Sequence, residues 1–117
     1  MEKTTAIQAL SALAHDRRLD VFRLLVAAEA PDPDKAGLTP SEIAAHLSLP
    51  APTLSFYLKE LSQAGLVEGE RNGRSIRYRA KLDTLRGLAA FLLEDCCRGL
   101  PAQTGVQPLN TAQEIPS

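Results

Sequence analysis

The stretch LTPSEIAAHLSLPAPTLSFYLKELSQAGLV, residues 38–67, contains the pattern that decides the fold. It opens with a capping box, in which the Thr39 hydroxyl accepts a hydrogen bond from a free backbone N–H and Glu42 reaches back to the Thr39 backbone. Pro40 suits the first turn of the helix that follows. We therefore expect a short helix here, with an inward side formed by Ile43, Ala44 and Leu47.

A second helix follows after a very short break. The segment SLPAP, residues 48–52, leaves room for a tight turn before a helix that we expect from about Pro52 to Ala64. Gly65 lies where a helix commonly ends on a glycine with positive φ. Two helices joined by so short a turn predict a helix-turn-helix. The predicted buried side of the second helix is Leu54, Tyr57, Leu58 and Leu61.

The next segment, LVEGERNGRSIRYRA (residues 66–80), predicts a β-hairpin. Asn72-Gly73 favours a two-residue type I′ turn, because both central residues of that turn need positive φ. Apolar residues lie on both sides of the turn, as in paired strands. A helix-turn-helix followed by such a hairpin is a winged helix. The apolar positions are Leu66, Val67, Ile76 and Tyr78.

Further helices flank this unit on both sides. Helical spacing of apolar residues predicts a helix over 4–14, a second that Asp16 caps, and a last helix over 82–98 that Gly99 and Pro101 end. The fold class is therefore mainly α with a β-hairpin wing, in one domain over residues 1–99. Residues 100–117 have little apolar content and no basic residue, and we expect a disordered C-terminal tail.

Length and composition are those of one soluble domain. The chain has 117 residues, of which 44% are hydrophobic and 23% charged. No apolar run approaches the roughly 20 residues that a membrane span requires. The first residues, MEKTTAIQAL, lack the layout of a signal peptide, so we expect a cytoplasmic protein without a membrane partner.

The charge distribution points to a nucleic-acid partner, although the net charge is −1. Residues 71–81 contain five basic residues and no acid. A local field, rather than the net charge, decides where a polyanion binds. This strip could instead be an ordinary solvated surface, but beside a helix-turn-helix it favours double-stranded DNA.

The second helix of the predicted motif would enter the major groove with its outward residues. Thr53 and Ser55 can hydrogen-bond bases or phosphates, and Lys59 can neutralise a phosphate. Phe56 could touch a thymine methyl, or it could make a contact within the protein. In the wing, Arg71 and Arg74 bracket the turn, whereas Arg77 and Arg79 share one strand face. The predicted DNA-binding residues are Pro52, Thr53, Ser55, Phe56, Lys59, Arg71, Arg74, Arg77 and Arg79.

Taken together, the sequence resembles the ArsR/SmtB family of dimeric, metal-responsive winged-helix repressors. The segments that carry the resemblance are LSALAHDRRLDVFRLL (residues 10–25), residues 38–67 and RNGRSIRYRA (residues 71–80). The resemblance implies a homodimer in which the first and last helices pair across a two-fold axis. It also implies a palindromic operator, repression without ligand, and release on ligand binding.

The position of the cysteines is similar to one arsenic-responsive branch of that family. The short helix lacks the Cys-x-Cys of another arsenic-sensing branch, and the last helix lacks the histidine ligands of the zinc sensors. Adjacent cysteines end the last helix, and TLSF lies in the recognition helix, as in the similar branch. Two departures are Tyr57, where a histidine is usual, and the absence of a further downstream cysteine found in some members.

Cys96 and Cys97 are the two cysteines of the chain. Neighbours on a helix point about 100° apart, so both can hold one ion only if the last turn loosens. Soft thiolates select centres such as trivalent arsenic or antimony. These centres prefer three thiolates, so the third ligand would be a partner cysteine, a hydroxide, a small thiol, or a methyl group already on arsenic. Arsenite, methylarsenite and antimonite are therefore the candidate inducers.

Several alternatives to an arsenic site remain open at this stage. Zinc prefers four ligands, and the histidines of the chain, His15 and His46, are better explained as structural or surface residues. Cys96 could be buried in a dimer interface with Cys97 incidental, or the pair could be a redox or persulfide switch. Glu94 and Asp95 disfavour a thiolate, so we expect no enzyme.

We therefore predict a DNA-binding repressor of an arsenic-resistance operon that trivalent arsenic or antimonite releases from its operator. One alternative is a thiol-redox or persulfide-responsive winged-helix repressor. An alternative of a different class is a winged-helix protein-interaction module that does not bind DNA.

Overall fold

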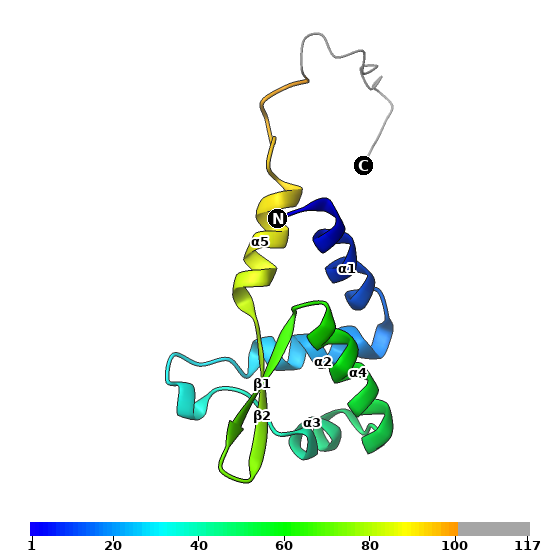
Figure 1. Cartoon of the computed structure of the whole chain (residues 1–117), viewed down its shortest axis with the longest axis vertical. Helices are drawn as coiled ribbons and strands as arrows, with labels where there is room; N and C mark the ends of the chain where they lie inside the picture. Colours follow the sequence, from blue (N-terminus) through cyan, green and yellow to red (C-terminus); the bar gives the residue numbers. More distant parts are fainter. Residues whose placement is uncertain (101–117) are drawn as a thin grey trace.

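A computed structural model describes residues 1–100, apart from the side chain of Asn72. It confirms the winged helix-turn-helix that the sequence predicts (Figure 1). The predicted disordered tail lies, from residue 101 onward, outside the described residues. The elements are α1 (Lys3–Leu13), α2 (Asp16–Ala27), η1 (Pro33–Lys35), α3 (Pro40–Leu47), α4 (Ala51–Gln63), β1 (Val67–Asn72), β2 (Ser75–Ala80) and α5 (Leu82–Leu92).

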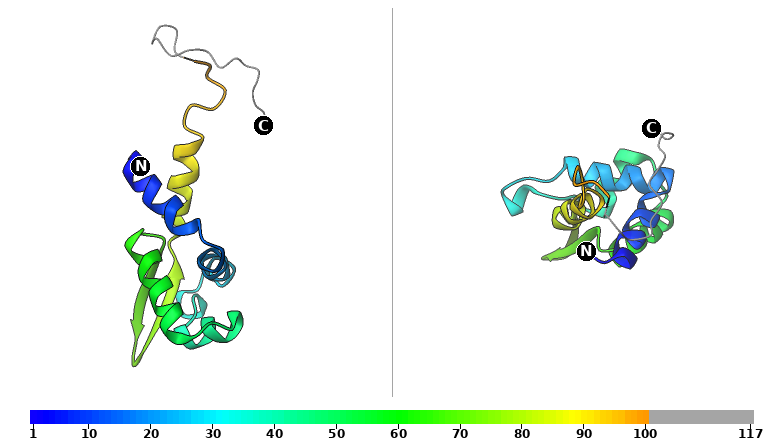
Figure 2. Two further views of the ribbon diagram at one scale, coloured as in Figure 1. Left: turned by 90° about the vertical axis from the view of Figure 1, so that its right-hand side faces the viewer. Right: turned by 90° about the horizontal axis from the view of Figure 1, so that it is seen from above.

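One core joins the helix-turn-helix to α1, α2 and the base of the wing. Each of these elements contributes apolar residues to one buried cluster, and the helices are arranged around it (Figures 1 and 2). Phe22 fills the interior from α2, and Leu88 joins it from α5. The largest fully buried side chains are Val21, Leu25, Ile43, Leu54, Leu61, Leu66 and Val67.

The capping box at α3 is confirmed. Thr39 Oγ1 accepts from the backbone N–H of Glu42 at 3.2 Å, and Glu42 Oε1 accepts from the backbone N–H of Thr39 at 2.8 Å. The hydrogen bond from the Thr39 backbone lowers the pKa of the Glu42 carboxyl. At the other end of α3, the Arg17 guanidinium donates to the Leu47 carbonyl, which ties α3 to α2. Both ends of α3 are thus satisfied by side chains.

The recognition helix α4 ends in the predicted glycine cap. Gly65 has φ +75°, and its N–H donates to the Ser62 carbonyl at 3.0 Å. The Leu66 N–H donates to the Leu61 carbonyl at 2.9 Å, which completes a Schellman motif. This turn directs the chain from α4 into β1.

The turn of the wing lies one residue later than predicted. Asn72 pairs with Ser75, so Gly73 and Arg74 are the central residues rather than Asn72 and Gly73. Gly73 has φ +66°, and a glycine with positive φ at the first central position is typical of a type II′ turn. Asn72 is instead the last paired residue of β1.

Two helix ends also differ from the prediction. His15, not Asp16, caps α2, because its Nδ1 accepts from the Arg18 backbone N–H at 3.3 Å. Helix α5 ends at Leu92 instead of Arg98. Leu92 and Leu93 are 60% and 63% exposed, so residues 1–100 offer no packing that would support a further helical turn.

Helices α1 and α5 lie beside each other and project from the body (Figures 1 and 2). The buried side of α1 consists of the small residues Ala6, Ala9 and Ala12. Its larger residues Ile7 and Leu10 are 53% and 41% exposed. Among the described residues, no helix is long and apolar enough to cross a membrane. The exposed large apolar residues of α1 and of the end of α5 are together called the α1/α5 face below: Ile7, Leu10, Leu92 and Leu93.

Candidate nucleic-acid interface and thiol pair

The outward side of α4 presents polar and aromatic groups on a rigid support. Leu54 and Leu58 are buried and hold the helix against the core. Phe56 is 54% exposed, although its ring centroid lies 6.3 Å from that of Tyr57, so much of the ring remains accessible to a partner. Thr53 is half-buried. The remaining predicted contact residues, Pro52, Ser55 and Lys59, are exposed.

The tip of the wing carries two exposed arginines. Arg71 pairs with Ile76, one position before the last pair of the hairpin, and Arg74 lies in the turn itself. A hairpin that projects with arginines at its end can place them on the phosphate backbone or in a minor groove. Arg71 and Arg74 are therefore exposed at the end of the wing, and their contact with DNA stays a prediction.

Arg77, in contrast, binds the segment before α3. Its Nε and Nη2 donate to the carbonyls of Ala36 and Gly37 at 3.3 and 3.1 Å. Next to it, Tyr78 exchanges two backbone hydrogen bonds with Leu38, at 2.8 and 3.0 Å. The backbones approach so closely that a Cβ on Gly37 would lie 2.6 Å from the Tyr78 carbonyl oxygen. Arg77 thus fixes the wing to the start of the helix-turn-helix.

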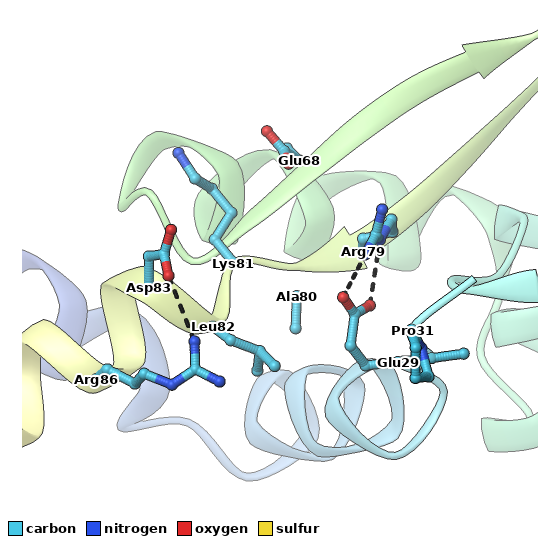
Figure 3. Close-up of a pocket in the computed structure, with 10 residues that line it drawn as sticks. Glu29, Pro31, Glu68, Arg79, Ala80, Lys81, Leu82, Asp83 and Arg86 are labelled. Atoms are coloured by element: carbon cyan, nitrogen blue, oxygen red, sulfur yellow. Dashed lines mark hydrogen bonds and ion pairs between the residues drawn. The ribbon is translucent and has the colours of Figure 1, made fainter. Parts of the chain in front are cut away.

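Arg79 is also held within the chain. Its guanidinium makes two hydrogen bonds to the Glu29 carboxylate, one of them from Nε to Oε1 at 3.2 Å (Figure 3). The hydrogen bond with Glu29 raises the pKa of Arg79, and the two side chains are only 20% and 19% exposed. Arg77 and Arg79 therefore differ from the prediction that all four wing arginines face DNA: their side chains position the wing.

The Arg79–Glu29 pair borders a cleft of about 650 Å³ between the end of α2, the base of the wing and the start of α5 (Figure 3). Glu68 and Lys81 line the same cleft, and Asp83 Oδ1 accepts from Arg86 Nη1 at 3.4 Å. Acidic and basic groups alternate here, so the cleft has no strong single charge. Sequence reasoning missed Glu29 because no local pattern connects it to a strand fifty residues later.

The two cysteines lie just beyond α5, where the chain is no longer helical. Their Sγ atoms are 3.2 Å apart, and both residues are exposed. Cys97 has φ +67°, a left-handed conformation that brings the neighbouring sulfurs together. The hydrogen bond to Cys97 raises the pKa of the Cys96 thiol. Cys96 is therefore exposed in the single chain and forms half of an accessible dithiol.

In the part of the chain that the structure describes, the pair does not belong to a larger metal-binding cluster. Among the described residues, no group of three or more histidine, cysteine, aspartate or glutamate side chains could hold a metal ion. His46 is exposed in the last turn of α3, and His15 serves as the cap of α2. The donor set at the end of α5 is thus two sulfurs, which suits a thiophilic centre that brings its own remaining ligand better than it suits zinc.

Comparisons with known proteins agree with this architecture. A family model described as a helix-turn-helix domain matches residues 13–70. An ArsR-like transcriptional regulator from Rhodococcus sp. RHA1 is 27% identical, with a TM-score of 0.65 over 78% of this chain and 77% of that one. A homodimeric winged helix-turn-helix DNA-binding domain from Mycobacterium bovis, a possible ArsR-family regulator, is also 27% identical, with a TM-score of 0.61 and 78% of each chain covered.

A third similar structure is described as a possible transcriptional regulator for arsenical resistance. It is 26% identical, with a TM-score of 0.59 over 74% of this chain and 81% of that one. No relative among curated proteins matches this chain. The helix-turn-helix match and these structures support a DNA-binding regulator, and the chain has the winged helix-turn-helix fold of ArsR-type transcriptional regulators.

Proposed function

We propose that the chain is a homodimeric transcriptional repressor of arsenic-resistance genes, which binds a palindromic operator and is released by trivalent arsenic at Cys96 and Cys97. The observation that carries the proposal is the 3.2 Å approach of the two sulfurs at the end of α5, beside the exposed apolar α1/α5 face. Ligand site and dimer contact would then share one helix.

Dimerisation explains the exposed apolar side chains. Ile7, Leu10, Leu92 and Leu93 are each more than two-fifths exposed, although such side chains are stabilised by about 25 cal/mol per Å² of apolar surface when buried. A two-fold contact between α1 and α5 of two subunits would bury them. The similar Mycobacterium bovis domain is homodimeric.

The dimer would present two copies of α4 to successive turns of the major groove. Helix-turn-helix dimers bind half-sites about one helical turn apart, so the operator would be palindromic. Ser55 and Lys59 would meet base edges and phosphates from α4, and Arg71 and Arg74 would bind the phosphate backbone from the wing. Arg77 and Arg79 would contribute by keeping the wing in place.

The thiol pair can capture trivalent arsenic by exchange of ligands. Each thiol replaces one hydroxide on arsenic: an As–S bond forms, an As–O bond breaks, and the thiol proton leaves with the hydroxide as water. Arsenite keeps one hydroxide after two such exchanges, whereas methylarsenite keeps its methyl group and needs no third sulfur. A pair of sulfurs without a third thiol in the same chain therefore fits both arsenicals.

The protein is released from DNA if the arsenic-bound conformation at the end of α5 is incompatible with the dimer that binds DNA. Only Glu94 and Asp95 separate the thiols from Leu93 of the α1/α5 face, so a rigid ring through both sulfurs would alter that contact. A coupling of about 1–3 kcal/mol between the two sites is sufficient for a useful response. The thiol pair and the dimer contact are neighbours in the sequence, so a change at the thiols can act directly on the contact.

A titration tests the proposal. Wild-type protein bound to DNA from upstream of its own gene is titrated with arsenite, methylarsenite, antimonite and zinc, and binding is followed by fluorescence anisotropy. We expect release by the arsenicals and antimonite and little response to zinc. Release by zinc alone would contradict the proposed ligand, and failure to bind any duplex would favour the protein-interaction alternative.

Thiol oxidation is a second candidate signal, favoured by the same proximity of the sulfurs. Two thiols and one peroxide would give a disulfide and two waters, with the thiols oxidised and the peroxide reduced. A disulfide between neighbouring residues strains the peptide that joins them, so we rank this signal below arsenic. Separate treatment with peroxide and with arsenite distinguishes the two signals.

A further inference from the structure

Three side chains meet where α1 turns into α2, directly against the recognition helix. They are His15 and Arg18 from the start of α2 and Tyr57 from α4, and we name them the junction cluster. The centroid of the Tyr57 ring lies 5.1 Å from that of His15 and 6.0 Å from the Arg18 guanidinium carbon. Both distances suit an aromatic pair and a cation–π contact.

Arg18 connects three helices at once. Its Nε donates to the Ala12 carbonyl in the last turn of α1 at 2.8 Å. Its backbone N–H donates to His15 Nδ1, which caps α2. Its guanidinium then covers the Tyr57 ring of α4. One side chain thus joins the end of the helix that carries Ile7 and Leu10 to the helix that would enter the groove.

Tyr57 lies at a sensitive position in α4. It is half-buried and follows Phe56, which points outward, and precedes Leu58, which is buried. The ring therefore lies at the border between the outward side of α4 and the core. A shift of Arg18 against this ring would rotate or tilt the outward residues next to it.

The contact between α1 and α4 is otherwise loose along one side. A cleft of about 300 Å³ opens between them, lined by Ile7, Gln8, Ser11, Ala12, Arg18, Glu60, Gln63 and Ala64. The fully buried residues of α1 are the alanines Ala6, Ala9 and Ala12, and Leu13 at its end packs against the core while partly buried. Small residues and an open cleft constrain the angle between α1 and α4 only weakly. The contacts at the junction of the helices therefore set this angle.

We propose that Arg18 and Tyr57 are positioning residues that set the angle of the recognition helix relative to the dimer helix α1. In the dimer they would thereby fix the spacing between the two copies of α4. This inference rests on the proposed dimeric DNA binding but not on the arsenic site. It also gives a role to Tyr57, at which the sequence departs from the family pattern.

The test separates spacing from simple affinity. The wild-type protein selects a palindromic duplex from a random pool, and anisotropy then measures its affinity for that duplex and for one with a single intact half-site. The gain is the ratio of the affinity for the palindrome to the affinity for the half-site duplex. It reports how well α4 of the second subunit is placed. Arg18→Met and Tyr57→Leu remove the contact, whereas Arg18→Lys keeps the cation and Tyr57→Phe keeps the ring.

In Arg18→Met and Tyr57→Leu, we expect the gain to fall by roughly three- to tenfold, the change that a cation–π contact supports. Their affinity for the half-site should stay within about twofold of wild type. Arg18→Lys and Tyr57→Phe should keep most of the gain. Arg23→Met, at an exposed arginine of the same helix, is the matched control and should change nothing. Thermal unfolding and sedimentation show whether each variant is folded and dimeric; if Arg18→Met is unstable, the two Tyr57 variants decide.

Two results would overturn the inference. A parallel loss on the palindrome and the half-site would mean that Tyr57 merely supports α4 or touches DNA. An unchanged gain in folded Tyr57→Leu would mean that the helix angle is fixed elsewhere. If the wild-type protein selects no duplex or shows no gain, it is the proposed dimeric repressor that fails, and this is seen before any variant is made.

Discussion

The guanidinium of Arg79, in β2, makes a two-point ion pair with the carboxylate of Glu29, just beyond α2. Fifty residues separate the two in sequence, and each is about four-fifths buried. Together with the hydrogen bonds of Arg77 to Ala36 and Gly37, this pair anchors the wing to the rest of the domain. Arg77 and Arg79 therefore hold the hairpin against the domain, whereas Arg71 and Arg74 are exposed at its outer end.

Arg79→Met tests the anchoring role. Removal of Arg79 leaves the largely buried Glu29 carboxylate without its hydrogen bonds, so the free energy of unfolding should fall by about 1–3 kcal/mol. Urea denaturation measures the change. Arg71→Met is the control at the exposed end of the wing and should lie within about 0.5 kcal/mol of wild type. Equal stability of both variants would contradict the anchoring role.

Arg74→Ala tests the tip of the wing. The affinity should fall on every duplex by a similar factor, because a phosphate contact carries no base information. Two wings bind in a dimer, so the slope of log affinity against log salt should become shallower by roughly 2. Anisotropy at several salt concentrations gives both values. A change of base preference at one operator position, with the slope unaltered, would instead place Arg74 on a base edge.

The capping box predicts a stability that depends on pH. Hydrogen bonding in the folded state lowers the pKa of Glu42 from its ordinary 4.5, so the folded state binds its proton less readily than the unfolded state does. The contribution of Glu42 is present above pH 4.5 and is lost as the pH falls through the lowered value. Urea midpoints of wild type and Glu42→Ala should therefore differ at neutral pH and converge in acid.

Thr39→Ala is the companion variant at the same cap. Loss of the hydroxyl that accepts from the Glu42 backbone should cost about 1 kcal/mol at neutral pH, whereas Thr39→Ser should be nearly neutral. A constant difference between the urea midpoints of wild type and Glu42→Ala at every pH would contradict the Glu42 prediction. It would mean that the ionised carboxylate of Glu42 does not support the cap.

The thiol pair predicts a shift in reactivity. Cys97 raises the pKa of Cys96 through a hydrogen bond, which favours the neutral thiol over the thiolate that alkylating reagents attack. In Cys97→Ala, the pH midpoint of Cys96 alkylation should therefore move to lower pH. Mass spectrometry after iodoacetamide treatment at a series of pH values measures the midpoints. An unchanged midpoint would mean that the Sγ atoms do not interact in solution.

Local sequence signals predicted the central part of the fold well. The capping box at Thr39 and the glycine cap at Gly65 depend on residues a few positions apart, so their pattern is visible in the sequence. The same holds for the buried leucines of α4. The hairpin was predicted, but its turn was misplaced by one residue, because Asn72-Gly73 and Gly73-Arg74 both supply the positive φ that a tight turn needs.

Features that depend on contacts between residues distant in the sequence were not predictable from it. Arg77 and Arg79 look like exposed cations until the loop after α2 brings Glu29 and two backbone carbonyls to them. The end of α5 was placed at Arg98 because apolar spacing continues beyond Leu92, yet the described chain supplies nothing for those residues to pack against. The proximity of the two sulfurs follows from that early helix end and was not predictable from adjacency alone.

The central claim is that Cys96 and Cys97 connect arsenic to release from DNA. The most direct measurement compares wild type with Cys96→Ser, Cys97→Ser double-mutant protein on the operator, by anisotropy during an arsenite titration. Both proteins should bind the operator with similar affinity, and arsenite should release the wild type while the double mutant stays bound. Release of the double mutant at the same arsenite concentration would contradict the account and place the sensor elsewhere in the chain.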